Sequence, residues 1–154
     1  MQTLYLDISG LFILMVGFVL GLGAVTVIDI HGFLGRKSYY WTEATTRTHK
    51  ITKPLIWLGI TLAILGGFIF YRNFYIDNII IIHLISIPIM VFNGMFLSFK
   101  VSPFLIQREK EGNSSSLLPD SWQRKITISF IISFILWWGN LLLLGISISK
   151  NLFI

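Results

Sequence analysis

The chain has 154 residues, of which 55% are hydrophobic and 12% charged, and its formal net charge is +5. Soluble domains carry about 25% charged residues, so this composition indicates a single integral membrane domain without a separate soluble one. The chain has no cysteine, which excludes disulfides, iron–sulfur clusters and thiolate metal sites. Its basic residues flank apolar stretches, as they do beside anionic lipid headgroups, which argues against nucleic acid as a partner.

Four apolar stretches predict four transmembrane helices within one domain, residues 1–154. The expected spans are residues 8–28, 55–70, 79–99 and 126–148. The second is at the short end of what about 30 Å of hydrocarbon requires. We therefore expect an all-α, multi-pass four-helix bundle, embedded in a bacterial-type inner membrane or an organelle membrane.

Lys and Arg residues are divided unequally between the two sides of the predicted bundle. Ten of the 12 lie in or directly beside the connections 32–53 and 100–124, whereas Arg72 and Lys150 lie on the opposite side. Cytoplasmic loops of membrane proteins carry an excess of Lys and Arg. Both connections are therefore expected in the cytoplasm, and both termini on the outer side.

Small residues share one face in each of the first two spans. In lipid, such faces let two helix backbones approach closely, so helix packing is the plain interpretation, and room for a flat cofactor is the alternative. The residues are Gly10, Gly17, Gly21 and Ala24 in the first span and Gly59, Ala63 and Gly66 in the second. Between the spans, we expect a short interfacial helix that ends before Pro54, with the proline starting span two.

The third span carries its only ionisable side chain, His83, on a narrow polar face with Ser86 and Asn93. Span four has a similar face that includes Ser133 and Asn140. At about 1.5 Å rise per residue, His83 lies nearly level with Asn140, and Asn93 with Ser133. Two polar layers are therefore expected to join spans three and four.

A faint internal similarity suggests a 2+2 parallel repeat about the membrane normal. Gly23 and residues 33–34 recur 71 positions later as Gly94 and residues 104–105. Trp41 and Trp57 recur 81 positions later as Trp122 and Trp138. Matches of this kind also arise by chance in apolar sequence, so both interpretations stay open. A genuine repeat would put Phe12 in the place of His83.

His83 is the strongest candidate for chemistry. A neutral imidazole can ligate haem iron or another metal, or exchange protons, and the alternative is a structural hydrogen bond to Asn140, a serine or a carbonyl. No second histidine lies at the same depth within one chain, so a haem would be five-coordinate or shared between two chains. The supporting residues would be Asp7, which could orient the imidazole, together with Ser86, Asn93 and Asn140.

A second polar group lies at the expected cytoplasmic edge and comprises Asp29, His31, Glu43 and His49. These side chains are hard or borderline ligands, so a divalent metal at His31 and His49 is one interpretation. Their spacing matches no metal motif, and ordinary interfacial polar residues are the other interpretation.

The sequence around span three resembles a known group of small membrane proteins. Residues 83–86 (HLIS) are followed by Gly94, Phe96 and residues 102–105 (SPFL). This pattern is similar to that of CopD-like copper-resistance proteins and of the membrane-bound protoporphyrinogen oxidase of many bacteria. The resemblance implies a helical bundle that holds b-type haem or copper, with His83 as a ligand.

Three functions follow as hypotheses. The first is a small membrane redox or cofactor-binding protein that holds haem b or a metal through His83. The second is a non-enzymatic subunit or scaffold, packed in a homo-oligomer or a larger membrane complex. The third is an oligomeric channel or carrier for small molecules. A pump is disfavoured, because no Asp, Glu, Lys or Arg lies in the interior of a predicted span.

Overall fold

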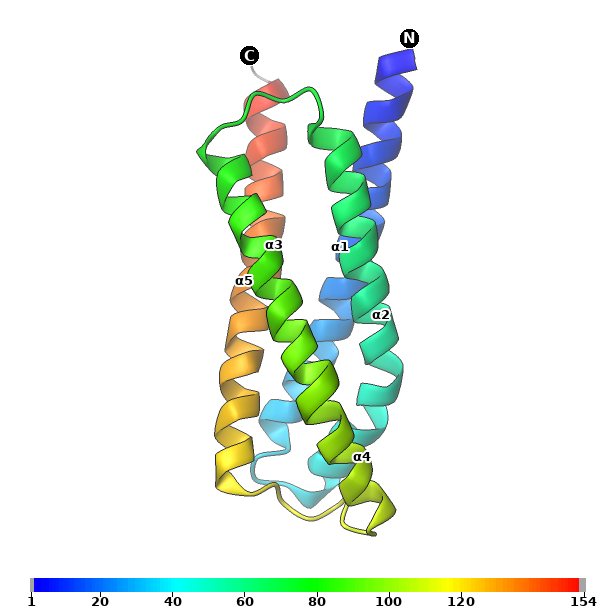
Figure 1. The fold of residues 1–154 in the computed structure, drawn as a ribbon, viewed down its shortest axis with the longest axis vertical. Helices are drawn as coiled ribbons and strands as arrows, with labels where there is room; N and C mark the ends of the chain where they lie inside the picture. The colour runs from blue at the N-terminus through cyan, green and yellow to red at the C-terminus, as the bar shows by residue number, and fades with distance from the viewer. Residues whose placement is uncertain (1, 153–154) are drawn as a thin grey trace.

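The computed structural model describes residues 2–152, and within them it is built from long helices joined by short connections (Figure 1). The elements are α1 (Gln2–Leu34), α2 (Tyr39–Tyr71), α3 (Asn78–Phe96), the π-helical segment η1 (Leu97–Val101), α4 (Ser102–Lys110) and α5 (Asp120–Leu152). Because α3, η1 and α4 run on as one segment, there are four helices long and apolar enough to cross a membrane. The predicted all-helical, multi-pass character is confirmed.

The helices are longer than the predicted spans. α1, α2 and α5 have 33 residues each, which is about 50 Å of helix against about 30 Å of hydrocarbon. The segment 32–53, expected to be mainly a loop, is mostly helix, and only residues 35–38 connect α1 to α2. Hydropathy marks the hydrocarbon-facing part of a helix, whereas its hydrogen bonds continue into the polar zone on either side.

The expected interfacial helix ending before Pro54 is wrong, because α2 passes through Pro54 without a break. Proline removes one N–H and disfavours a helix interior by about 3 kcal/mol. Buried residues before Pro54 pack this half of α2 into the bundle, among them Thr42, Thr45 and Thr46. Their hydroxyls donate to carbonyls within or just before α2, as in Thr45 Oγ1 to Trp41 O at 2.7 Å. Packing of this half of α2 against the bundle offsets the cost of the proline.

The small-residue faces of α1 and α2 meet along most of their length, in agreement with the interpretation of these faces as helix-packing surfaces. A Cβ built on Gly17 would lie 2.7 Å from Gly59 O, and one built on Gly59 would lie 2.5 Å from Gly21 Cα. Further towards the chain termini, Gly66 packs against the backbone of Leu14. The two helices therefore form a close antiparallel hairpin, in which glycine is required by backbone approach rather than by backbone conformation.

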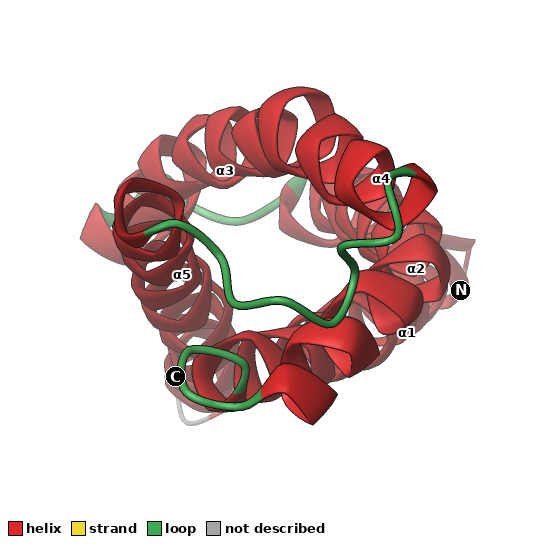
Figure 2. Ribbon diagram, turned by 90° about the horizontal axis from the view of Figure 1, so that it is seen from below, coloured by secondary structure: helices red, strands yellow, loops and turns green. Residues whose placement is uncertain are grey.

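The third segment crosses the bundle at a slant. At the end that carries both termini, called the terminal end here, α3 lies beside α5; at the opposite end, the loop end, α4 lies beside α2 (Figure 1). Viewed along the bundle, the helices form a ring in the order α1, α2, α3/α4 and α5 (Figure 2). α3 and α2 therefore diverge towards the terminal end.

The π-helical turn η1 has a local cause in Pro103. This residue lacks the N–H that would bond to Phe99 O in an α-helix, and Ser102 N–H instead bonds five residues back to Leu97 O. The carbonyl of Ser98 thereby loses its ordinary partner, and Lys53 Nζ lies 3.3 Å from it. Ser98 Oγ also accepts a 2.8 Å bond from Trp57 Nε1. The turn thus ties the third segment to α2.

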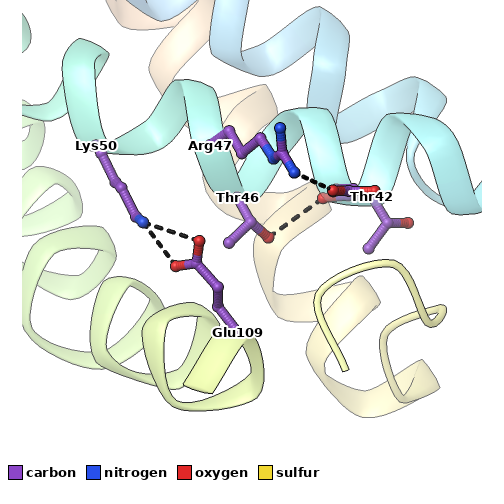
Figure 3. A network of polar contacts seen from close by, with 6 residues as sticks. Thr42, Thr46, Arg47, Lys50 and Glu109 are labelled. Atoms are coloured by element: carbon purple, nitrogen blue, oxygen red, sulfur yellow. Dashed lines mark hydrogen bonds and ion pairs between the residues drawn. The ribbon is translucent and has the colours of Figure 1, made fainter. Parts of the chain in front are cut away.

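At the loop end, charged residues join neighbouring helices outside the apolar zone (Figure 3). Lys50 of α2 forms an ion pair with Glu109 of α4, with Nζ 2.7 Å from Oε2. Arg47 pairs with Glu43 within α2 at 2.6 Å. Exposed pairs of this kind contribute about 0–1 kcal/mol each, so they orient this end more than they stabilise the bundle.

Candidate functional site

Two polar layers join α3 to α5 at the depths predicted from the sequence. In the layer nearer the loop end, Asn93 Nδ2 donates to Ser133 Oγ at 2.8 Å and to Ser129 O at 3.1 Å. Ser129 Oγ returns a 2.6 Å bond to Asn93 Oδ1. The amide of Asn93 is therefore satisfied within the protein, and this layer is structural.

The layer nearer the terminal end contains His83, whose side chain is only 9% exposed. Its Nε2 lies 3.1 Å from the backbone oxygen of Asn140. Since a carbonyl can only accept, Nε2 carries the proton, and in the neutral imidazole Nδ1 carries the lone pair. Within the described part of the chain Nδ1 makes no hydrogen bond of its own.

The other polar groups of this layer satisfy one another. Asn140 Nδ2 donates to Leu136 O at 2.6 Å and lies 3.4 Å from Met90 Sδ. Ser86 Oγ lies 2.7 Å from both Asn140 Oδ1 and His83 O, and its single proton serves one of them. The backbone oxygen of Asn140 therefore orients the imidazole, while Ser86 bonds to the His83 backbone and to the Asn140 side chain. Nδ1 of His83 is left for an external partner.

His83 lines a cavity of about 280 Å³ between α2 and α3, closed behind by α1 and α5. We call it the His83 cavity. Most of its wall is apolar, and its residues include Phe18, Gly67, Tyr71, Arg72, Met90, Trp137 and Asn140. Tyr71 packs edge-on against the imidazole with ring centroids 5.7 Å apart. A nine-tenths buried histidine in such a wall is the arrangement expected of a small-molecule site.

The cavity reaches the outer surface of the bundle where α2 and α3 diverge. Phe68 and Leu84 line it and are 70% and 51% exposed. These residues lie near the terminal ends of two apolar helices, so the cavity is open at the outer surface of the bundle.

Asp7, predicted as an orienting partner of His83, is placed elsewhere. Its Oδ1 lies 2.9 Å from an Arg72 guanidinium nitrogen, and this ion pair joins α1 to the end of α2. The imidazole is oriented by Asn140 instead. Phe12, the counterpart of His83 in the suggested repeat, is 67% exposed, so the two positions have different surroundings. The repeat itself stays a prediction.

Two residues of the second polar group have separate hydrogen-bond or ion-pair partners. His31 Nδ1 lies 3.2 Å from Thr48 Oγ1, and Glu43 pairs with Arg47. His49 and Asp29 are buried. Within residues 2–152, no three His, Asp or Glu side chains come together in a way that could hold a metal ion. A divalent metal at His31 and His49 remains an untested prediction.

Comparison with protein-family models, with curated proteins and with solved structures finds no match to this chain. The sequence predicts His83, Ser86 and Asn140 in this layer but does not indicate Tyr71, Arg72 and Trp137 as neighbours of His83. The end of α2 carries no sequence signal that it would border the cavity.

Proposed function

We propose that this membrane protein binds a small lipophilic molecule that enters the His83 cavity sideways from the bilayer. The observation that carries the proposal is the imidazole of His83, buried in an apolar wall with Nδ1 left unpaired. A ligand that donates a hydrogen bond to Nδ1 satisfies its lone pair, and the apolar part of the ligand covers the cavity wall.

The site fits haem b poorly. An imidazole binds a planar macrocycle most easily through Nε2, which here donates to Asn140 O. Nδ1 is adjacent to the ring carbon that carries the side chain, so a macrocycle bound there would meet the backbone of α3. No second histidine lines the cavity among the described residues. Copper fits no better, because the Met90 thioether is engaged by Asn140.

An absorption spectrum separates these alternatives at once. We expect protein purified in mild detergent to show no Soret band and no stoichiometric copper or iron. A Soret band lost in His83→Ala would restore the haem hypothesis and overturn the preference stated here.

The direct test is to fill the cavity with a larger side chain on one of the residues that line it. Gly67 lines the cavity, and a Cβ built there meets only Leu14 Cδ1, at 4.0 Å. Gly67→Leu therefore places a side chain in the cavity without a backbone clash. Gly145→Leu is the matched control, because a Cβ on Gly145 meets nothing within 4 Å and Gly145 does not line the cavity.

The measurement is the amount of each lipophilic molecule that co-purifies with the protein, determined by mass spectrometry of organic extracts. We expect one class of molecule to be retained by the wild type and by Gly145→Leu, and lost from Gly67→Leu. Equal retention by all three proteins would contradict the proposal. A partner protein lost only from Gly67→Leu would instead favour a scaffold, with a partner side chain filling the cavity.

A further inference from the structure

We infer that the molecule bound in the His83 cavity carries a hydroxyl donor on a single aromatic ring, as a quinol does, and that the site prefers a quinol to its quinone. This inference rests on the proposed function and deepens it. It follows from the direction of one hydrogen bond and from the shape and chemistry of the cavity wall.

The hydrogen bond to Asn140 decides what His83 can recognise. Because Nε2–H is used by a backbone carbonyl, the neutral imidazole offers the cavity only the lone pair of Nδ1, which accepts and cannot donate. A quinol hydroxyl supplies a proton to such an acceptor. A quinone carbonyl supplies none, so it would bury two acceptors against each other.

No other group of the wall competes for this role. The amide of Asn140 and the hydroxyl of Ser86 are engaged with protein atoms. The hydroxyl oxygen of Tyr71 is buried, and the Tyr71 ring packs edge-on against the imidazole. Arg72 is paired with Asp7 at the mouth. The wall therefore offers a ligand one polar contact, Nδ1 of His83, and this atom binds only a hydrogen-bond donor.

The wall also suits a flat ring with an apolar tail. Phe18 and Trp137 stand edge to face behind the cavity, with ring centroids 6.0 Å apart, and Tyr71 forms a further aromatic side. A volume of about 280 Å³ is near the lower limit of small-molecule sites, which favours one ring over a fused ring system. An alkyl or isoprenoid tail would leave past Phe68 and Leu84 into the hydrocarbon.

A charged phospholipid headgroup fits less well. Its phosphate would have to lie about 7 Å below the start of α3, the level of His83, and burying it there is costly without a free cation. Arg72 is the cation on the wall, and its guanidinium is shared with Asp7.

The test compares a short-chain alkyl benzoquinol with its quinone, by calorimetric titration of the protein in lipid nanodiscs under anaerobic conditions at neutral pH. The quinol gains one hydrogen bond to Nδ1 that the quinone cannot make, and this corresponds to about a tenfold difference in Kd. We expect the quinol to bind about tenfold more tightly than the quinone. His83→Leu should abolish the difference, Gly67→Leu should abolish the binding of both, and Gly145→Leu should change neither.

A second ligand pair needs no variant, and therefore stands even if His83→Leu fails to fold. An alkyl phenol and its O-methyl ether share the ring and differ in the donor. The phenol should bind more tightly to the wild-type protein, again by about tenfold. Equal affinities within the quinol–quinone pair and within the phenol–ether pair would overturn the inference and leave the proposed function standing. The same conclusion would follow if none of the four probes bound while another lipophile co-purified. If no lipophile co-purifies and no probe binds, both are lost.

Discussion

Nε2 of His83 on α3 lies 3.1 Å from the backbone oxygen of Asn140 on α5, about one helical turn and a half from the start of α3. Together with the Asn93–Ser133 bond at 2.8 Å, this contact sets the register of α3 against α5. α3 is thereby hydrogen-bonded to α5 at the terminal end, while η1 is hydrogen-bonded to α2 further down, where Lys53 and Trp57 bond to Ser98. The opening of the His83 cavity is a consequence of this pairing.

The Asn93–Ser133 bond should show energetic coupling. We expect Asn93→Leu and Ser133→Ala each to destabilise the bundle, and the double variant to lose less than their sum. The expected coupling is about 0.6 kcal/mol and at most about 1.7 kcal/mol, as found for hydrogen bonds between helices in lipid. The measurement is a double-mutant cycle on unfolding in mixed micelles. Strict additivity would mean that the bond makes no net contribution.

The depth of these polar layers was predictable from the sequence, because helical rise and periodicity alone place residues that lie on one straight helix. The His83 cavity was not. It depends on the slant of α3 across the bundle (Figure 1), which helical rise and periodicity do not determine. The predicted contact of Asp7 with His83 is wrong for a related reason. Helical rise places both residues near the terminal end, but it does not determine which neighbouring helix each side chain faces.

The close contact of α1 with α2 predicts opposite effects for two glycines in the same helix. A Cβ on Gly17 would collide with the backbone of Ala63 and lie 2.7 Å from Gly59 O, whereas one on Gly23 would meet nothing within 4 Å. Gly17→Ala should destabilise the bundle by about 1–3 kcal/mol through overpacking. Gly23→Ala should be neutral or stabilising by up to about 1 kcal/mol, because alanine favours helix.

Thermal or denaturant unfolding of the two variants in one detergent checks this prediction. Gly67→Ala is a third variant for this comparison, because its Cβ would meet only Leu14 Cδ1, at the ordinary contact distance of 4.0 Å. A destabilisation of Gly23→Ala as large as that of Gly17→Ala would show that helix backbone effects dominate over the α1–α2 contact.

The charge distribution predicts the orientation in the membrane. Ten of 12 Lys and Arg residues lie in or beside the segments 32–53 and 100–124, at the loop end, which should therefore be cytoplasmic. Because the chain has no cysteine, single cysteines at Ser38, Ser115 and Asn73 can be labelled without background. We expect an impermeant reagent added outside to label Asn73→Cys only. Labelling of Ser38→Cys and Ser115→Cys with Asn73→Cys protected would reverse the orientation.

The ion pair of Asp77 and Lys150 at the terminal end predicts a pH dependence of stability. Asp77 lies between the spans, with Oδ2 2.9 Å from Lys150 Nζ, and Oδ1 accepts from the N–H groups of Ile79 and Ile80 at 3.0 Å. The hydrogen bond from Lys150 is the largest cause that holds the pKa of Asp77 below its usual value, followed by the bond from Ile80 N–H. The charged carboxylate therefore stabilises both the start of α3 and its contact with α5.

The sign of the pH dependence follows from this lowered pKa. The unfolded chain binds a proton on Asp77 more readily than the folded one, so the contribution of Asp77 is complete above the unfolded pKa of about 3.9 and is lost as the pH falls through the lower, folded pKa. Asp77→Asn keeps an acceptor for Ile79 and Ile80 but removes the charge. We expect this variant to have a lower melting temperature than the wild type at neutral pH and low salt. The two melting temperatures should converge as the pH falls below about 4. Lys150→Gln should show the same neutral-pH loss, since it removes the other half of the pair. A difference between Asp77→Asn and the wild type that stays constant from neutral to acidic pH would mean that the carboxylate acts by shape and not by charge.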